Sequence, residues 1–145
     1  MGHAKFRYLE HTADLKFEAF GKTLSEALEN AALAMFSAIV ELNEIEIKSE
    51  KKIGFRYENV EDLVHDWLNE LLFLFSVDGW LFKEFKVRVN EGEKTFAGVA
   101  RGEVYNQKKH RLELEIKAIT YHDLVVEKIK HKGEILWRVQ VVCDT

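Results

Sequence analysis

Apolar residues recur along this chain with two spacings, and each spacing predicts a type of secondary structure. They alternate with polar residues over 6–10 and 15–20, which is the period of a strand with one buried face. They recur every three or four residues from Thr23 to Ile39 and again over 60–75, which is the period of an amphipathic helix. Between the helices, the isoleucines and phenylalanine of 45–55 predict a further strand.

Beyond Asp78 and Gly79 the period of two returns and persists to the end of the chain. The expected strands are 85–89, 96–104, 112–116, 124–126 and 137–141. Because successive strands joined by short turns pair antiparallel, we expect an α+β fold. It is a single domain over residues 1–145, with two main helices packed on a largely antiparallel β-sheet.

Both helices have start signals. Thr23 and Glu26 have the spacing of a capping box, and Asn59 can cap the second helix. The last turns of that helix, residues 71–75, are apolar on every side. A helix that is apolar all round is buried all round, so we expect the second helix to be buried and covered on both faces.

Composition narrows the class of protein. Hydrophobic residues make up 47% of the chain, which is enough for a sizeable core, and the net charge of −4 disfavours tight, unaided nucleic-acid binding. The single Cys143 excludes an internal disulfide and fits a reducing compartment. No leader peptide and no membrane-length apolar stretch is visible, so we expect a cytoplasmic protein with no membrane partner.

The stretch from Leu9 to Leu15 concentrates polar chemistry between two strand-like segments. His11, Thr12 and Asp14 supply an imidazole, a hydroxyl and a carboxylate in a short break of the kind where scaffolds carry functional groups. The alternative is an ordinary strand connection in which Asp14 turns the chain with its own side chain.

Two later stretches carry similar groups. Residues 117–122 place Lys117, a threonine, a tyrosine and a histidine between strands, and the chain ends with Asp144 and Thr145. A side-chain carboxylate beside the α-carboxylate, with Asp14 as a third source of oxygen, suits calcium, magnesium or manganese. The alternative is a frayed acidic terminus.

Other candidate sites are weaker. His11, His110 and His122 form a metal site only if the fold gathers them. A catalytic pair of His65 and Asp66 is disfavoured, because adjacent residues on a helix point apart. Cys143 lies in an apolar strand and is expected to be a buried structural thiol.

Several of these stretches, in this order, resemble the archease family over essentially the whole chain. The matching segments are Tyr8–Asp14, Thr23–Ala27, Glu61–Leu72, Lys117–His122 and the terminal Asp144. The resemblance implies a protein cofactor rather than an enzyme. Its partner is the GTP- and manganese-dependent tRNA-splicing RNA ligase, whose guanylylation and multiple turnover it promotes in tRNA splicing and RNA repair.

The resemblance also assigns residues. Asp14, Asp144 and Thr145 correspond to the family's metal ligands, with calcium the expected ion and magnesium or manganese as alternatives. Lys117 and His11 lie near that site. Two departures are visible: Thr145 stands where the family commonly has an aliphatic residue, and the loop 102–110 lacks a frequent Asp-Pro.

Two other functions stay open, the first of them also implied by the resemblance. A general chaperone, or a modulator of RNA-modifying enzymes such as methyltransferases, predicts an exposed apolar patch away from the acidic tip. A metal-dependent hydrolase needs a general base within reach of a bound water, and His11 or His122 would have to supply it.

Overall fold

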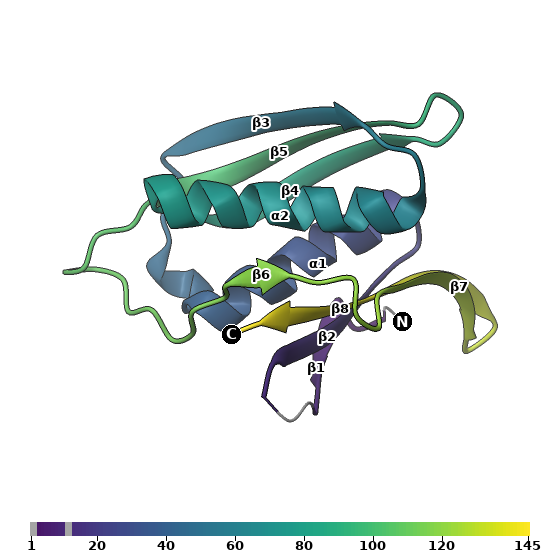
Figure 1. Ribbon diagram of the computed structural model, residues 1–145, viewed down its shortest axis with the longest axis horizontal. Coiled ribbons are helices and arrows are strands. Elements are labelled where there is room, and N and C mark those ends of the chain that lie inside the picture. Colours follow the sequence, from purple (N-terminus) through teal and green to yellow (C-terminus); the bar gives the residue numbers. More distant parts are fainter. Residues whose placement is uncertain (1–2, 11–12) are drawn as a thin grey trace.

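The computed structural model describes residues 3–10 and 13–145 and has two antiparallel sheets and two long helices (Figure 1). The elements are β1 (Phe6–Leu9), β2 (Leu15–Gly21), α1 (Leu24–Ile39), the 3₁₀ turn η1 (Leu42–Glu44), β3 (Ser49–Arg56), α2 (Val60–Asp78), β4 (Trp80–Asn90), β5 (Thr95–Val104), β6 (Ala118–Ile119), β7 (Val125–His131) and β8 (Glu134–Asp144). The predicted α+β class is confirmed, with two sheets rather than one.

Strand β8 is the centre of the first sheet. The sheet has the order β1-β2-β8-β6, and β7 also pairs with β8; the second sheet has the order β3-β5-β4. Because β8 is 11 residues long, β7 and β6 pair with successive parts of the edge that β2 leaves open. The C-terminal residues therefore lie beside the start of β2.

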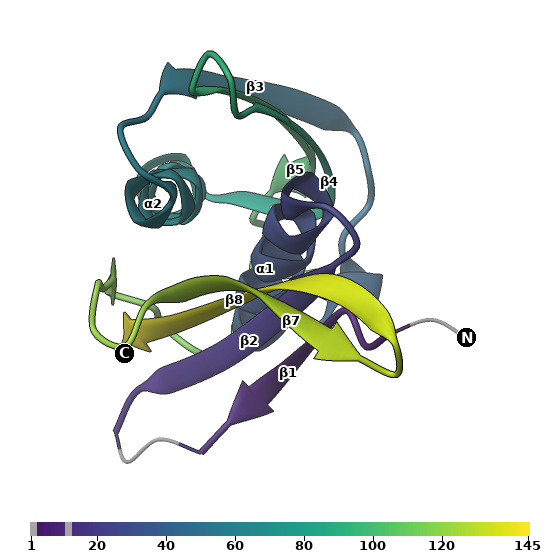
Figure 2. The ribbon, with the colours of Figure 1, turned by 90° about the vertical axis from the view of Figure 1, so that its right-hand side faces the viewer.

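Helix α1 lies between the two sheets, with α2 beside it (Figure 2). Its fully buried face carries the small residues Ala27, Ala31 and Ala34, which let backbones approach closely. The two helices are joined by a buried hydrogen bond in which Trp67 Nε1 donates to the carbonyl of Leu28 at 2.9 Å. No helix in the described ranges is long and apolar enough to cross a membrane.

Both predicted helix caps are present. The N–H of Glu26 donates to Thr23 Oγ1 at 3.1 Å, and the N–H of Asp62 donates to Asn59 Oδ1 at 2.9 Å. The carboxylate of Glu26 completes its half of the motif one residue earlier than expected, because it accepts from the N–H of Lys22 at 2.8 Å. Satisfied backbone donors at these positions fix where both helices begin.

Helix α2 is buried on one face only. The buried residues are Leu63, Val64, Trp67, Leu68, Leu71 and Leu72. Phe73 and Val77 are 53% and 62% exposed, so the prediction that this helix is covered on both faces is wrong in its last turns. The reason is position: α2 lies at the open side of the sandwich, and its outward face reaches the surface (Figure 2).

The predicted strand at 112–116 is also wrong. Residues 105–117 form a strap that turns at 107–109, and its one ladder contact in that range is an isolated bridge between Val40 and Leu112. Beside it, the N–H of Glu113 donates to the carbonyl of Ile39 at 2.7 Å. The alternating pattern did not produce a strand because this segment lies against the end of α1, at Ile39 and Val40, and not along a sheet edge.

The strand predicted over 45–55 begins later than its isoleucines suggest. The 3₁₀ turn at Leu42–Glu44 comes first, and β3 starts at Ser49. Ile45 is buried in the core and Ile47 is exposed, so both precede the ladder.

Candidate functional site

Two of the predicted ligands lie at the same end of neighbouring strands. Leu15 of β2 pairs with Cys143 of β8. Directly opposed residues of an antiparallel pair have Cα atoms about 4.5–5.5 Å apart. Asp14 and Asp144 are the next residue outward on each strand, so the fold brings them together from opposite ends of the chain.

The end of the chain is held on both sides. Thr145 Oγ1 donates to the carbonyl of Ala13 at 3.0 Å, and the N–H of Lys117 donates to the carbonyl of Asp144 at 2.7 Å. Ala118 pairs with Asp144 in the short β6–β8 ladder. The alternative of a frayed terminus is therefore wrong, and the backbone of Lys117 lies directly beside that of Asp144.

The thiol of Cys143 responds to both carboxylates. Burial raises its pKa, and the negative charges of Asp144 and Asp14 raise it further, to about 12. The residue is a free, fully buried cysteine, which confirms the structural role expected for it.

An all-oxygen group of this kind fits a hard cation. Asp14 and Asp144 offer side-chain carboxylates, and Thr145 offers its α-carboxylate and hydroxyl, which are the ligands that calcium, magnesium and manganese prefer. No three His, Cys, Asp or Glu side chains gather at metal-binding spacing within residues 3–10 and 13–145. An ion here would complete its shell with Thr145 and water. His11 and Thr12 lie outside the described residues.

Residues 6–145 match the Archease protein family (MTH1598/TM1083). The chain belongs to the archease family. The resemblance seen in the short motifs is therefore confirmed over nearly the whole length of the chain.

Individual relatives agree with this assignment. The chain is 44% identical over 143 residues to the protein archease of Methanosarcina acetivorans, covering 97% of this chain and 95% of that one. It is 39% identical over 142 residues to the protein archease of Pyrococcus furiosus, covering 97% of this chain and 98% of that one.

Two solved structures share the fold. The solution structure of Methanobacterium thermoautotrophicum protein 1598 has a TM-score of 0.81 at 34% identity and covers 97% of this chain and 99% of that chain. A crystal structure from Thermotoga maritima, described as an archease and possible chaperone, has a TM-score of 0.55 at 27% identity and covers all of both chains.

The described histidines of the proposed three-histidine cluster serve separate contacts. His110 is buried and contacts Glu103, whereas His122 is exposed and lies 3.3 Å from the carboxylate of Asp123. Because His11 lies outside the described residues, only His110 and His122 of the three can be located. Neither has the neighbours that a metal site needs.

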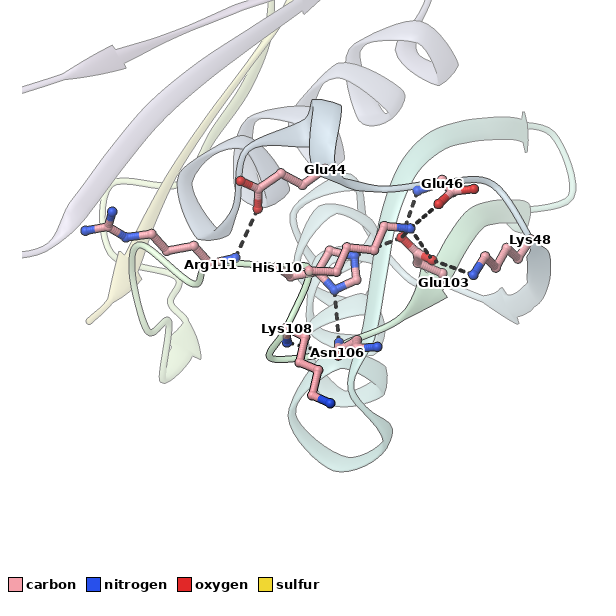
Figure 3. Close-up of polar contacts among 9 residues, drawn as sticks. Glu44, Glu46, Lys48, Glu103, Asn106, Lys108, His110 and Arg111 are labelled. Atoms are coloured by element: carbon pink, nitrogen blue, oxygen red, sulfur yellow. Dashed lines mark hydrogen bonds and ion pairs between the residues drawn. The ribbon is translucent and has the colours of Figure 1, made fainter.

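Sequence reasoning missed the buried network around Glu103, which Figure 3 shows. His110 Nδ1 accepts from the N–H of Asn106 at 2.9 Å, so its proton is on Nε2, which donates to Glu103 at 2.8 Å. Lys109 lies 2.8 Å from the same carboxylate, and the N–H of Glu46 donates to it at 2.8 Å. Burial alone raises the pKa of Glu103, but these donors outweigh it and lower the pKa to about 2.

The network around Glu103 also positions the strap of residues 105–117, which leads to Asp144. It fixes the start of the strap 105–117 against β5, and the far end of the strap is fixed at Asp144 through Lys117. The strap is thus held at both ends. A glutamate followed seven residues later by a histidine gave no recognisable signal in the sequence, because the loop between them sets their contact.

His65 and Asp66 differ from expectation. His65 Nδ1 lies 3.1 Å from Asp66 Oδ1, although adjacent helical residues were expected to point apart. The ring of Tyr121 stacks on His65 with centroids 4.4 Å apart, and its hydroxyl donates to Asp62 at 2.7 Å. That hydrogen bond, with burial and the charges of Asp62 and Asp66, raises the pKa of Tyr121 to about 12. The group anchors the segment after β6 to α2, which is a structural role.

Proposed function

We propose that this protein is a non-catalytic activator of the GTP-dependent tRNA-splicing ligase in the cytoplasm. It would promote guanylylation and multiple turnover of the ligase during tRNA splicing and RNA repair. Membership of the archease family supports the proposal. The chain's net charge of −4 agrees with it, because the ligase rather than this protein would hold the RNA.

The observation that carries the proposal is the pairing of Leu15 with Cys143. It brings Asp14 and the exposed Asp144 to the same end of the sheet, where both offer carboxylate oxygens. A divalent ion, with calcium the expected one, supplies positive charge that neutralises phosphate or positions the ligase's own ions. The carboxylates hold the ion, and the strap presents Lys117 beside Asp144.

A groove of about 660 Å³ begins at this tip and supports contact with a protein partner. It lies between the end of α2 and the strap, and its lining includes Val77, Tyr105, Leu112, Ile116 and Lys117. A partly apolar groove whose lining includes Lys117 is a suitable surface for a docked protein partner.

The exposed apolar side chains also favour a second candidate, a general chaperone or a modulator of RNA-modifying enzymes such as methyltransferases. That function predicts apolar surface remote from the acidic tip. The exposed Val77 lines the same groove as Lys117, so this apolar surface is not remote from Lys117. We therefore prefer the ligase activator as the proposed function. Suppression of aggregation of unrelated clients would support the chaperone.

The test is RNA ligation at limiting ligase, with and without this protein. We expect wild type to give multiple turnover, and Asp14→Asn or Asp144→Asn to reduce the stimulation at least tenfold. Glu91→Gln, a change in an exposed carboxylate in the turn between β4 and β5, is the matched control and should stimulate fully. An Asp14→Asn protein with a normal melting temperature and full stimulation would contradict the metal tip.

A direct binding experiment separates the ion from the partner. Calorimetric titration of calcium into the isolated protein should show one site that both Asp variants weaken. The isolated protein should also leave phosphoester substrates intact, because an activator needs the ligase for the reaction. Turnover by the isolated protein would favour the hydrolase instead.

A further inference from the structure

A second pocket, of about 290 Å³, opens on the face of the first sheet that points away from α1. Phe17 and Ala19 of β2 face α1 and are fully buried, so the alternating Glu18 and Phe20 face the other way. The β7–β8 hairpin bends toward the N-terminal end of the chain on this side (Figure 2). Residues of β1, β2, β7 and β8 all line the pocket.

Glu18 is 2% exposed although it lies on the outward face. Two arginines cover it: Arg7 donates its Nε to one carboxylate oxygen, and Arg138 donates its Nε to the other at 2.6 Å. Burial raises the pKa of Glu18, and the hydrogen bonds from Arg138 and Arg7 more than reverse this, so its pKa is lowered. The carboxylate fixes both guanidinium planes in the wall of the pocket.

The two arginines are not equivalent. Arg138 also donates to Glu127 and to Gln140, each at 2.6 Å, so both ends of its fork are engaged. Arg7 makes its one polar side-chain contact within the described part of the chain through Nε, and its side chain is 66% exposed. Its two terminal nitrogens therefore present the planar pair of donors that matches a carboxylate or phosphate.

The floor beside these donors is apolar. Phe20, Ile129 and Leu136 line it, and Leu136 is only 2% exposed although it lies outside the main core. A cationic fork next to a small apolar floor selects a ligand with both properties. The volume is at the lower end of ligand pockets, which fall in the range of about 300–1,000 Å³, so the apolar part is about one ring in size.

We propose that this pocket binds a carboxylate or phosphate group attached to a single apolar ring, with the anion on Arg7 and the ring on Phe20, Ile129 and Leu136. Glu18 is a positioning residue that holds Arg7. Two sources offer this chemistry, a free aromatic phosphate and the C-terminal residue of a protein chain. The site is separate from Asp14 and Asp144 and does not depend on the activator function.

The experiment is a titration of the full chain, labelled with ¹⁵N, followed by amide chemical shifts. The probes are phenyl phosphate, N-acetyl-L-phenylalanine and inorganic phosphate. We expect at least one of the two ring-bearing anions to bind at least tenfold more tightly than inorganic phosphate, with shifts centred on β1, β2 and the β7–β8 hairpin. Tighter binding of phenyl phosphate identifies the free aromatic phosphate as the source; tighter binding of N-acetyl-L-phenylalanine identifies a chain terminus.

Variants test the assigned contacts. Arg7→Ala should weaken binding at least tenfold, and Arg7→Lys should remain weaker than wild type because it keeps the charge without the fork. Arg56→Ala on the exposed edge strand β3 is the matched control and should bind normally. Ile129→Asp places a carboxylate in the floor and should abolish binding even if Arg7→Ala folds poorly.

Three results would overturn the proposal. They are no binding of either ring-bearing anion, equal affinity for inorganic phosphate, and unchanged binding by a folded Arg7→Ala protein. Each is read from binding alone, so none depends on whether the protein activates a ligase.

Discussion

The hydroxyl of Thr145 donates to the carbonyl oxygen of Ala13 at 3.0 Å, although 132 residues separate the two. This contact closes the tip of the molecule, because it ties the last residue to the segment that carries Asp14. It also gives the terminal threonine a use that an aliphatic residue cannot have. Thr145, which carries the α-carboxylate, is thereby held beside Ala13, the neighbour of Asp14.

The role of the terminus can be separated into hydroxyl and carboxylate. Thr145→Val keeps the α-carboxylate and loses an exposed hydrogen bond, so we expect the free energy of unfolding to fall by about 0.5–1 kcal/mol. Deleting Thr145 removes the tie and moves the α-carboxylate back by one residue. Calorimetry should show calcium affinity reduced at least tenfold by the deletion and far less by Thr145→Val. Equal losses would mean that the hydroxyl, not the carboxylate, matters.

Cys143 should be unreactive in the folded protein. Its pKa of about 12 leaves almost no thiolate at pH 8, and its sulfur is buried. We expect a thiol-specific disulfide reagent to label the native chain at least about a hundredfold more slowly than the chain unfolded in urea. Asp144→Asn should leave labelling slow, because burial is the largest cause of the raised pKa. Fast labelling of folded wild type would contradict the arrangement.

Glu103 should make the protein sensitive to acid. Its pKa is lowered from 4.5 to about 2 in the folded chain, so its contribution is present above pH 4.5 and is lost as pH falls toward 2. At pH 7 we expect Glu103→Gln to lower the free energy of unfolding by about 3 kcal/mol, because Lys109 and His110 lose a buried anionic partner. The difference between wild type and variant should shrink as the pH is lowered.

The control for Glu103 is Glu50, which forms an exposed ion pair with Arg101 at 3.1 Å. Glu50→Gln should change the free energy of unfolding by less than about 1 kcal/mol at any pH. Urea denaturation at pH 7, 5 and 3 checks both variants. A Glu103→Gln protein as stable as wild type at pH 7 would show that the network is not a stabilising one.

Gly102 permits a close approach between the backbones of the paired strands β4 and β5. A Cβ atom there would lie 1.8 Å from the carbonyl oxygen of Leu81, so the backbones of β4 and β5 would have to separate. We expect Gly102→Ala to destabilise the fold by about 3 kcal/mol. Gly92→Ala, whose Cβ would come no closer than 3.5 Å to Asn90, should change stability by less than about 0.5 kcal/mol. Thermal melting of the two variants makes the comparison.

Local patterns predicted the parts of the fold that local physics controls. Thr23 and Asn59 begin the helices as expected, because a cap depends on groups three residues apart. Most strands appeared near their predicted ranges for the same reason. The alternating segment at 112–116 did not, because a strand also needs a partner edge, and this segment lies against the end of α1 instead.

The candidate site was likewise predictable only in part. The motifs around Asp14, Lys117 and Asp144 could be read from the sequence, and they sufficed for the family. Their assembly could not, because it depends on the register of β2 against β8 across most of the chain.

What the sequence determined by itself was the type of most elements, the helix caps and the segments that carry the candidate ligands. What only the tertiary structure decided was which face of α2 reaches the surface, how Glu103 meets His110, and how Glu18 meets Arg138, which lies 120 residues further along the chain. The physical reason is that hydrophobic periodicity and capping are local, whereas burial and ion pairing depend on which distant segments share a surface.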